Sequence, residues 1–287
     1  MRLIIDTNQV DAILRTQPTN SIGPTLVIPP LVWSELMRSP HYGPKRANAL
    51  TAYDILFGID ISTLLDEFAH LSEKQIRGVE SVFRPTSDVH EFLMNGFTNP
   101  TAAHFKRADE LKQEADEFAK EVIERAKKDA QKYNNMRSRG DQLDFVKWNT
   151  IEDAEALLLA DENATWAAAT LALVTDNDTK NTKAKSKASL HEAIMDNSSV
   201  RLWTRVAITM SFGYRACWTD ETLNTTPAGN DLTDVSITAY ARPGNAILTA
   251  EKKLKRAIRH SDPESKFEVM TWAEYVAMRE KQINERR

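Results

Sequence analysis

Cysteine is almost absent from this chain, and glycine is scarce. Cys217 is the single cysteine among 287 residues, so no disulfide can form within the chain, and an oxidising compartment is not implied. Nine glycines are few for a protein rich in strands or loops, which favours a largely helical chain. Hydrophobic residues still make up 41% of the sequence and charged residues 27%, values typical of a globular protein with a sizeable core.

Long hydrophobic runs are missing as well. No stretch approaches 18 consecutive apolar residues, so the sequence predicts no transmembrane helix and no membrane partner. The first residues lack the apolar core of a secretory signal, because Asp6 and Asp11 interrupt them. A cytoplasmic location is therefore the expectation.

An excess of positive charge is the third feature that the chain lacks. Its net charge is −4, whereas a protein that holds nucleic acid by its whole surface is usually basic. This value does not exclude a nuclease, because a metal site needs clustered carboxylates that count against the basic residues. Any contact with phosphate must then come from local basic patches.

The two ends of the chain alternate between strand and helix patterns. Short apolar runs predict strands at 2–5, 25–28, 245–249 and 267–270. Helices are predicted after each strand. They lie near Asn8 to Leu14, from Pro30 to Leu36, over 45–57, over 250–259 and from a cap at Thr271 to about Arg279. Such alternation is typical of a parallel α/β sheet with right-handed crossovers.

The middle of the chain is different, with few convincing strands between about 64 and 197. Apolar residues three or four apart predict a long helix over 101–135, and helices are also predicted over 151–174, 200–216 and 231–241. The polar segment 176–188 has low complexity and is expected to be an exposed loop. The simplest organisation is an α/β core formed by residues 1–58 and 200–287, interrupted by a helical insertion at 59–199.

Acidic residues fall where such a sheet would place a functional site. Asp6 ends the first strand, and Glu251 follows the strand at 245–249, so both can lie at the carboxyl edge where open α/β sheets form their sites. Glu35 lies in the helix after the second strand, and Asp231 and Asp234 share one face of a helix start. Converging carboxylates supply the hard oxygen ligands that Mg²⁺ or Mn²⁺ prefers.

Each of these acids also has a purely structural alternative. Asp6 could end a strand or cap a helix, and Glu35 and Glu251 could be solvent-facing acids near helix starts, where the helix dipole favours them. Asp231 is interpreted as a helix N-cap before it is considered as a ligand. Asp234 is the least easily explained, because an acid stands there before an apolar helix face.

Five segments resemble the motifs of PIN-domain nucleases, and they occur in the same order. They are LIIDTN at 3–8, IPPLVWSEL at 28–36, NDLTDVSITAYA at 230–241, AILTAEKKL at 246–254 and FEVMTWAEYVA at 267–277. The resemblance covers about 1–58 and 200–287 and leaves the middle aside. It implies a three-layer α/β/α fold with a central, mostly parallel sheet, a PIN-like core into which the helical segment is inserted.

The resemblance also implies an activity and a site. Asp6, Glu35 and Asp234 would bind Mg²⁺ or Mn²⁺ at the catalytic centre, and Glu251 would complete it. The family commonly has aspartate at the fourth position, so Glu251 is a departure. Asp231 is an added acid that competes for a place among the metal ligands. The residues expected to orient the carboxylates or water are Thr7, Asn8 and Thr249.

Basic residues follow the fourth acid directly. Lys252, Lys253 and Lys255 could hold phosphates near the site, or they could form an ordinary solvated helix face. A second basic run within 176–188 has no interleaved aromatic residues, so it does not indicate stacking on bases. The 101–135 helix, with mixed charges, is interpreted as a packing arm or as the surface for a homo-oligomer or protein partner.

Two functions follow from these patterns. The first is a nuclease that hydrolyses phosphodiester bonds with Mg²⁺ or Mn²⁺, acting on single-stranded or structured RNA more readily than on DNA. The toxin of a toxin–antitoxin pair is a subclass of this function, although the chain is long for it. The second is a catalytically weak scaffold that binds RNA or protein partners through the helical insertion, which Glu251 and the acidic net charge favour.

Overall fold

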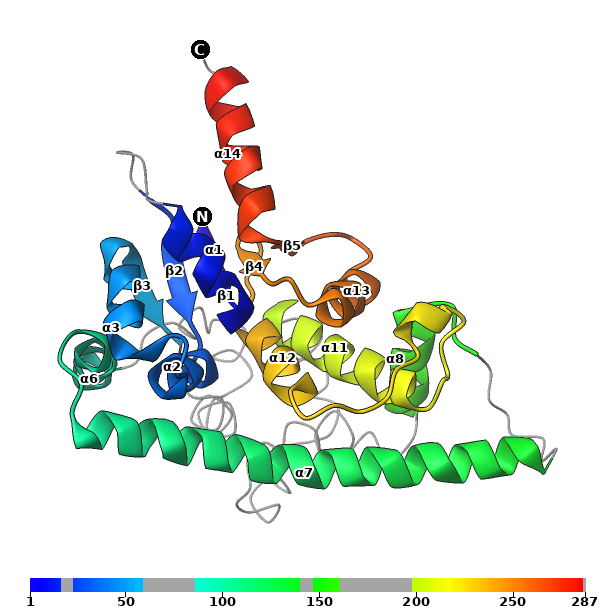
Figure 1. The fold of residues 1–287 in the computed structure, drawn as a ribbon. Helices are drawn as coiled ribbons and strands as arrows, with labels where there is room; N and C mark the ends of the chain where they lie inside the picture. Colours follow the sequence, from blue (N-terminus) through cyan, green and yellow to red (C-terminus); the bar gives the residue numbers. More distant parts are fainter. Residues whose placement is uncertain (17–22, 59–85, 140–146, 161–197, 286–287) are drawn as a thin grey trace.

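The fold was analysed in a computed structural model of the chain (Figure 1). The structure describes residues 1–16, 23–58, 86–139, 147–160 and 198–285. The predicted loop at 176–188 and the second half of the predicted helix at 151–174 lie outside these ranges.

A five-stranded parallel sheet forms the centre of the molecule, in the order β3-β2-β1-β4-β5. The strands are β1 (Arg2–Ile5), β2 (Thr25–Ile28), β3 (Asp54–Phe57), β4 (Ala246–Leu248) and β5 (Glu268–Met270). The register pairs Leu3 with both Leu26 and Ala246, so β1 lies between one strand from each side of the insertion. The predicted α/β class and four predicted strands are therefore confirmed.

The strand β3 was not predicted, and the helix expected over 45–57 was wrong at its end. Ala47, Leu50 and Tyr53 are buried at a spacing of three, and Phe57 continues that helical periodicity. The spacing of buried residues therefore does not distinguish a single helix over 45–57 from the observed helix followed by a strand. The helical part stops at Ala52, and residues 54–57 pair with β2 along its whole length, which satisfies backbone groups that would otherwise stay unpaired at that edge.

Helices connect and flank the strands. Between β1 and β3 they are η1 (Thr7–Gln9), α1 (Val10–Arg15), α2 (Pro30–Arg38), α3 (Gly43–Ala47) and η2 (Asn48–Ala52). The C-terminal part contributes α11 (Ser198–Tyr214), η4 (Glu221–Leu223), α12 (Asp231–Ile237), η5 (Thr238–Tyr240), α13 (Lys252–Ser261) and α14 (Trp272–Glu285). Thr271 and Glu274 cap α14 reciprocally, as a capping box does, so the predicted cap is confirmed.

The crossovers explain how the helices are layered. The chain steps from β1 to β2 in one direction along the sheet and from β4 to β5 in the other. Right-handed crossovers then place α1 and α13 on opposite faces of the sheet. This arrangement is compatible with a three-layer α/β/α fold.

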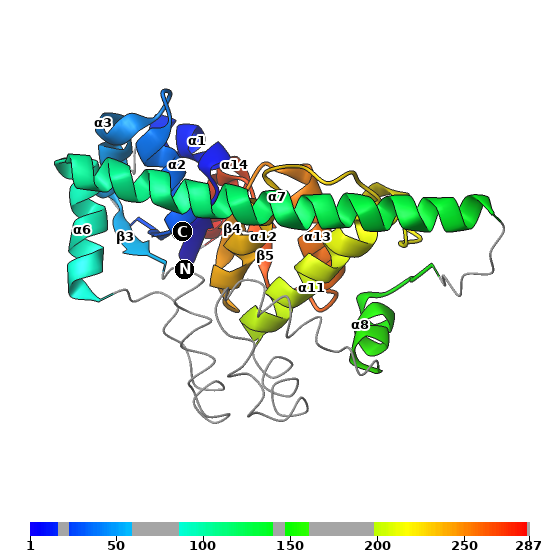
Figure 2. The same ribbon diagram turned by 90° about the horizontal axis from the view of Figure 1, so that it is seen from below.

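The described part of the insertion consists of α6 (Ser87–Thr98), α7 (Ala102–Ser138) and α8 (Ile151–Ala160). The predicted long helix is confirmed as α7, whose 37 residues span ~55 Å at 1.5 Å per residue. It runs beneath α2, α12 and α11, which it contacts (Figures 1 and 2). None of the described helices is long and apolar enough to cross a membrane.

Two buried hydrogen bonds join α6 and α7 of the insertion to α2. The indole Nε1 of Trp33 donates to the carbonyl oxygen of Leu93 in α6 at 3.0 Å. The hydroxyl of Ser34 donates to the carbonyl oxygen of Ala108 in α7 at 2.6 Å. Leu93 and Ala108 belong to the same hydrophobic core as the sheet, so α6 and the first turns of α7 are packed as part of the core rather than beside it.

A second, smaller core joins α8 to α11 away from the sheet. Trp148, Trp218 and Phe212 pack edge to face there. Next to them the buried guanidinium of Arg205 donates to both carboxylate oxygens of Glu155, at 2.7 and 2.6 Å. Trp148 and Trp203 are both buried.

Candidate functional site

The carboxyl ends of β1 and β4 bring Asp6 and Thr249 together from positions 243 residues apart. The backbone N–H of Asp6 donates to the carbonyl oxygen of Leu248 at 3.0 Å, which extends the pairing of the two strands by one residue. The Thr249 hydroxyl donates to Asp6 Oδ2 at 2.6 Å. Asp6 also caps η1 through the backbone N–H of Asn8, so it combines the structural role with a place at the sheet edge.

Asn8 and Thr249 connect Asp6 to the segment that carries Glu251. Asn8 Nδ2 donates to Asp6 Oδ2 at 2.5 Å, and Asn8 Oδ1 accepts from the backbone N–H of Ala250 at 3.0 Å. The Thr249 hydroxyl oxygen accepts from the backbone N–H of Glu251 at 2.9 Å. These contacts hold the loops after β1 and β4 in a fixed relation.

Glu35 reaches the same edge from α2. Pro29 precedes the helix and Pro30 occupies its first turn, where a missing N–H is tolerated, so the chain turns directly from β2 into α2. The Thr7 hydroxyl donates to Glu35 Oε2 in a short hydrogen bond. Thr7, the residue that follows Asp6, therefore links Glu35 to the end of β1.

Asp234 lies in the first turn of α12 and is buried. Its pKa is raised from 3.8 to about 8, first by burial and then by repulsion from Asp6, Glu251, Asp231 and Glu35. Burial also raises the pKa of Asp6, with a contribution from Glu251, and that of Glu35, with a contribution from Asp6. Acids from four separate segments therefore lie near enough to repel one another.

Asp231 is held in a different way. Its Oδ2 accepts from the Tyr214 hydroxyl at 2.6 Å, from Lys253 Nζ at 2.7 Å and from the backbone N–H of Ala228 at 2.8 Å. Asn230, and not Asp231, is the N-cap of α12, so the interpretation of Asp231 as the cap was wrong. These three donors all engage one of the two carboxylate oxygens of Asp231.

The three lysines after Glu251 have separate environments. Lys252 is exposed, whereas Lys253 pairs with Asp231 and Lys255 Nζ lies 2.9 Å from Glu274 Oε2. From α7, Lys112 lowers the pKa of Glu35 by its positive charge, and Asp116 raises it. The long helix of the insertion thus acts on the acidic site, which the sequence pattern did not indicate.

The acids suit a divalent cation in their chemistry, because all of their donors are hard carboxylate oxygens. Within the described ranges, however, no group of three or more His, Cys, Asp or Glu side chains is arranged so that it could hold a metal ion. Asp6 and Glu35 are engaged by Asn8, Thr249 and Thr7 instead. Holding a cation would require side-chain rotations that bring their oxygens together.

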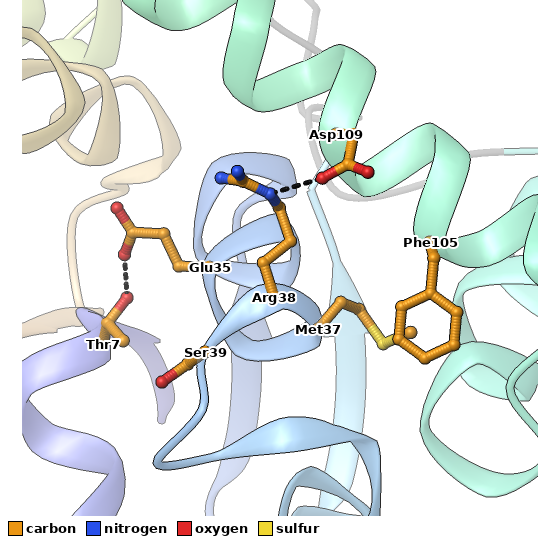
Figure 3. Close-up of a pocket in the computed structure, with 7 residues that line it drawn as sticks. All are labelled: Thr7, Glu35, Met37, Arg38, Ser39, Phe105 and Asp109. Atoms are coloured by element: carbon orange, nitrogen blue, oxygen red, sulfur yellow. Dashed lines mark hydrogen bonds and ion pairs between the residues drawn. The ribbon is translucent and has the colours of Figure 1, made fainter.

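A hollow of about 610 Å³ opens beside Glu35, between α2 and α7 (Figure 3). Its lining residues are Thr7, Glu35, Met37, Arg38, Ser39, Phe105 and Asp109. Glu35 points to Thr7, while Arg38, from the same helix, points to Asp109 of α7, with Arg38 Nε 2.6 Å from Asp109 Oδ1.

Sequence reasoning missed the part of this hollow that α7 contributes. Phe105 fits the apolar periodicity of the long helix, which predicts a buried position, yet the residue is 40% exposed. His104, Ala108 and Leu111 form the buried stripe, and Phe105 stands at its margin. An aromatic residue at the margin of a helical stripe, followed four residues later by an acid, was the available signal.

Comparisons with protein-family models, with curated proteins and with solved structures found no match to this chain.

Proposed function

We propose that this protein is a metal-dependent nuclease that hydrolyses phosphodiester bonds. The observation that carries the proposal is that buried Asp234 lies close to Asp6, Glu251 and Glu35, so that burial first, and then repulsion from these acids, raise its pKa to about 8. Mutual repulsion among buried acids costs stability, and such groups are characteristic of functional sites. The order of the motifs that resemble PIN-domain nucleases supports the same activity.

Four acids are the proposed ligands of Mg²⁺ or Mn²⁺, namely Asp6, Glu35, Asp234 and Glu251. A divalent cation held there would polarise the phosphodiester and lower the pKa of an attacking water. Thr249 and Asn8 orient the carboxylate of Asp6, and Thr7 orients that of Glu35.

Asp231 is proposed to hold Lys253 rather than a metal. The side chain of Lys253 is only 19% exposed, and its pairing with Asp231 fixes it in the first turn of α13, two residues after Glu251. Lys252 is exposed and makes no ion pair with the residues that the structure describes, so a phosphate could bind it without displacing one of them. RNA is proposed as the substrate on the resemblance alone.

The test compares Asp6→Asn with a matched control at the opposite edge of the sheet. Asp54 lies at the start of β3, is exposed and accepts from the Thr25 hydroxyl at 2.7 Å, so Asp54→Asn makes the same chemical change far from the site. With Mn²⁺ and labelled single-stranded RNA, we expect cleavage by the wild type and by Asp54→Asn. Asp6→Asn should lose at least 100-fold in rate, the order of magnitude for removing one strongly contributing group. Equal rates in all three proteins would contradict the assignment.

A second candidate function is a scaffold that binds RNA or a protein partner without cutting. The specific observation in its favour is that the described acids are not arranged as a metal centre. Calorimetric titration separates the two functions. A scaffold gives no heat with millimolar Mn²⁺ and no cleavage of mixed RNA, whereas the nuclease gives both, and Asp6→Asn abolishes both.

A further inference from the structure

We infer that the hollow between α2 and α7 is a subsite for one nucleotide of a single-stranded nucleic acid, with the base on Phe105 and the phosphate on Arg38. The inference rests on the proposed nuclease function for its ligand class. Phe105 comes from the insertion helix and Arg38 from the end of α2, and neither is one of the four proposed metal ligands, although Glu35 borders the hollow.

The position of the hollow favours a strand that continues from the acidic site. Glu35 and Thr7 form one side of the hollow, and Phe105 and Asp109 form the other (Figure 3). A substrate whose phosphate lies at Glu35 must therefore pass its next residues over α2 toward α7, or away into solvent. The volume of about 610 Å³ is in the range of sites for small ligands.

Phe105 supplies a stacking surface. Among the described residues, four large hydrophobic side chains are exposed, and Phe105 is the one that carries an aromatic ring. An isolated exposed hydrophobic residue needs no explanation by itself. An exposed ring that lines a hollow beside an arginine and a cluster of acids is different, because bases stack on aromatic rings with little dependence on their identity.

Arg38 supplies a cation that a phosphate can capture. Its partner Asp109 is 68% exposed, and Arg38 itself is 39% exposed. Exposed ion pairs contribute little to stability, so replacing Asp109 by a phosphate as the partner of Arg38 costs little free energy. The guanidinium can then bind two phosphate oxygens in a bidentate contact. Asp109 competes with the phosphate for Arg38, and in the absence of a nucleic acid it holds the Arg38 side chain in position.

This arrangement predicts that some substitutions weaken the binding of a single strand and that another strengthens it. Phe105→Leu keeps an apolar side chain but removes the ring, and should weaken binding about tenfold. Phe105→Trp should restore it. Arg38→Gln should weaken binding and reduce its dependence on salt. Asp109→Asn frees Arg38 and should strengthen binding two- to fivefold, which a merely structural role for Asp109 would not produce.

The experiment measures fluorescence anisotropy of labelled 12-residue oligouridine and oligothymidine, with Ca²⁺ in place of Mn²⁺ and intactness of the strand checked on gels. The two sugars distinguish RNA from DNA, and a duplex of the same length tests access to the base face. Val89→Ala in α6, exposed and outside the hollow, is the control. Mn²⁺-dependent hydrolysis of bis(p-nitrophenyl) phosphate, which has no base, reports the acidic site alone.

The outcomes separate this inference from the proposed function. Single-strand binding that falls with Phe105→Leu and rises with Asp109→Asn, while hydrolysis of the small diester is unchanged, supports both. Binding that is the same in all Phe105 variants, or absent in the wild type, overturns the subsite, whatever the small diester shows. Phe105-dependent binding without any Mn²⁺-dependent hydrolysis overturns the nuclease and leaves the subsite standing as a binding site.

Discussion

Asp234 provides the sharpest test of the acidic site, because its proposed role predicts that removing its charge stabilises the metal-free protein. Its carboxyl is 7% exposed, and its pKa is raised from 3.8 to about 8 by burial and by its acidic neighbours. The folded protein therefore binds a proton on Asp234 that the unfolded chain has released above pH 4. Stability from this group is present below pH 4 and is lost as the pH rises to about 8.

The magnitude follows from that change in pKa. Raising a pKa from 3.8 to about 8 corresponds to ~6 kcal/mol, because each pKa unit corresponds to ~1.4 kcal/mol. We expect Asp234→Asn to recover about 2–3 kcal/mol at pH 9, because single substitutions rarely change stability by more than ~4 kcal/mol. At pH 4 most of the gain should vanish, since the carboxyl is then neutral in the folded state and only about half ionised in the unfolded chain.

Urea unfolding in EDTA at pH 4, 7 and 9, followed by tryptophan fluorescence, measures the effect. Asp220→Asn is the control of opposite sign, because hydrogen bonds from Thr222 lower the pKa of Asp220 and its removal should cost stability at neutral pH. Saturating Mn²⁺ should reverse the order of wild type and Asp234→Asn. If Asp234→Asn is less stable than the wild type at pH 9 in EDTA, the acids do not repel one another as inferred.

Three further predictions concern the neighbouring contacts. Millimolar Mn²⁺ should raise the melting temperature of the wild type by several degrees in differential scanning fluorimetry, since a ligand bound by the folded state stabilises it, and Asp6→Asn should shift far less. Lys253→Met should cost about 3 kcal/mol in urea unfolding, because buried Asp231 loses its ion pair, whereas Lys252→Met should change stability by less than ~0.5 kcal/mol. Ser34→Ala should cost about 1 kcal/mol, and amide exchange in α7 should quicken, because the buried bond between α2 and α7 is lost; unchanged exchange would contradict that link.

The three central strands, β1, β2 and β4, could be predicted from the sequence because both faces of a central parallel strand are buried and the residues form continuous apolar runs. The strand β3 escaped because four residues are too few to establish a period of two. Its buried Phe57 also continues the helical spacing of Leu50 and Tyr53. Its assignment depends on pairing with β2, which is a contact between segments and not a property of either segment.

In the candidate site, too, the positions of the acids could be predicted from the sequence, whereas their contacts with other segments could not. That Asp6 and Glu251 could share an edge followed from strand ends, but the contacts that join their loops, from Thr249 and Asn8, required β4 to lie next to β1 across the whole insertion. Asp231 and Asp234 were indistinguishable as acids on one helix turn. They are separated by partners from elsewhere in the chain, because Tyr214 and Lys253 engage Asp231, whereas Asp234 faces other acids.

The insertion adds residues of α7 next to the acidic site. Helical periodicity over 101–135 showed that one face of α7 is buried, but it did not show what that face packs against. Because Ser34 fixes α7 to the helix that carries Glu35, every residue on the adjoining face of α7 is held at a set position relative to the acids. Phe105, Asp109 and Lys112 recur at spacings of four and three and so share that face. In the proposed function the carboxylates of the core hold a cation, and α7 adds the ring of Phe105 and the charge of Asp109 next to Arg38, with which a strand could be placed upon the site.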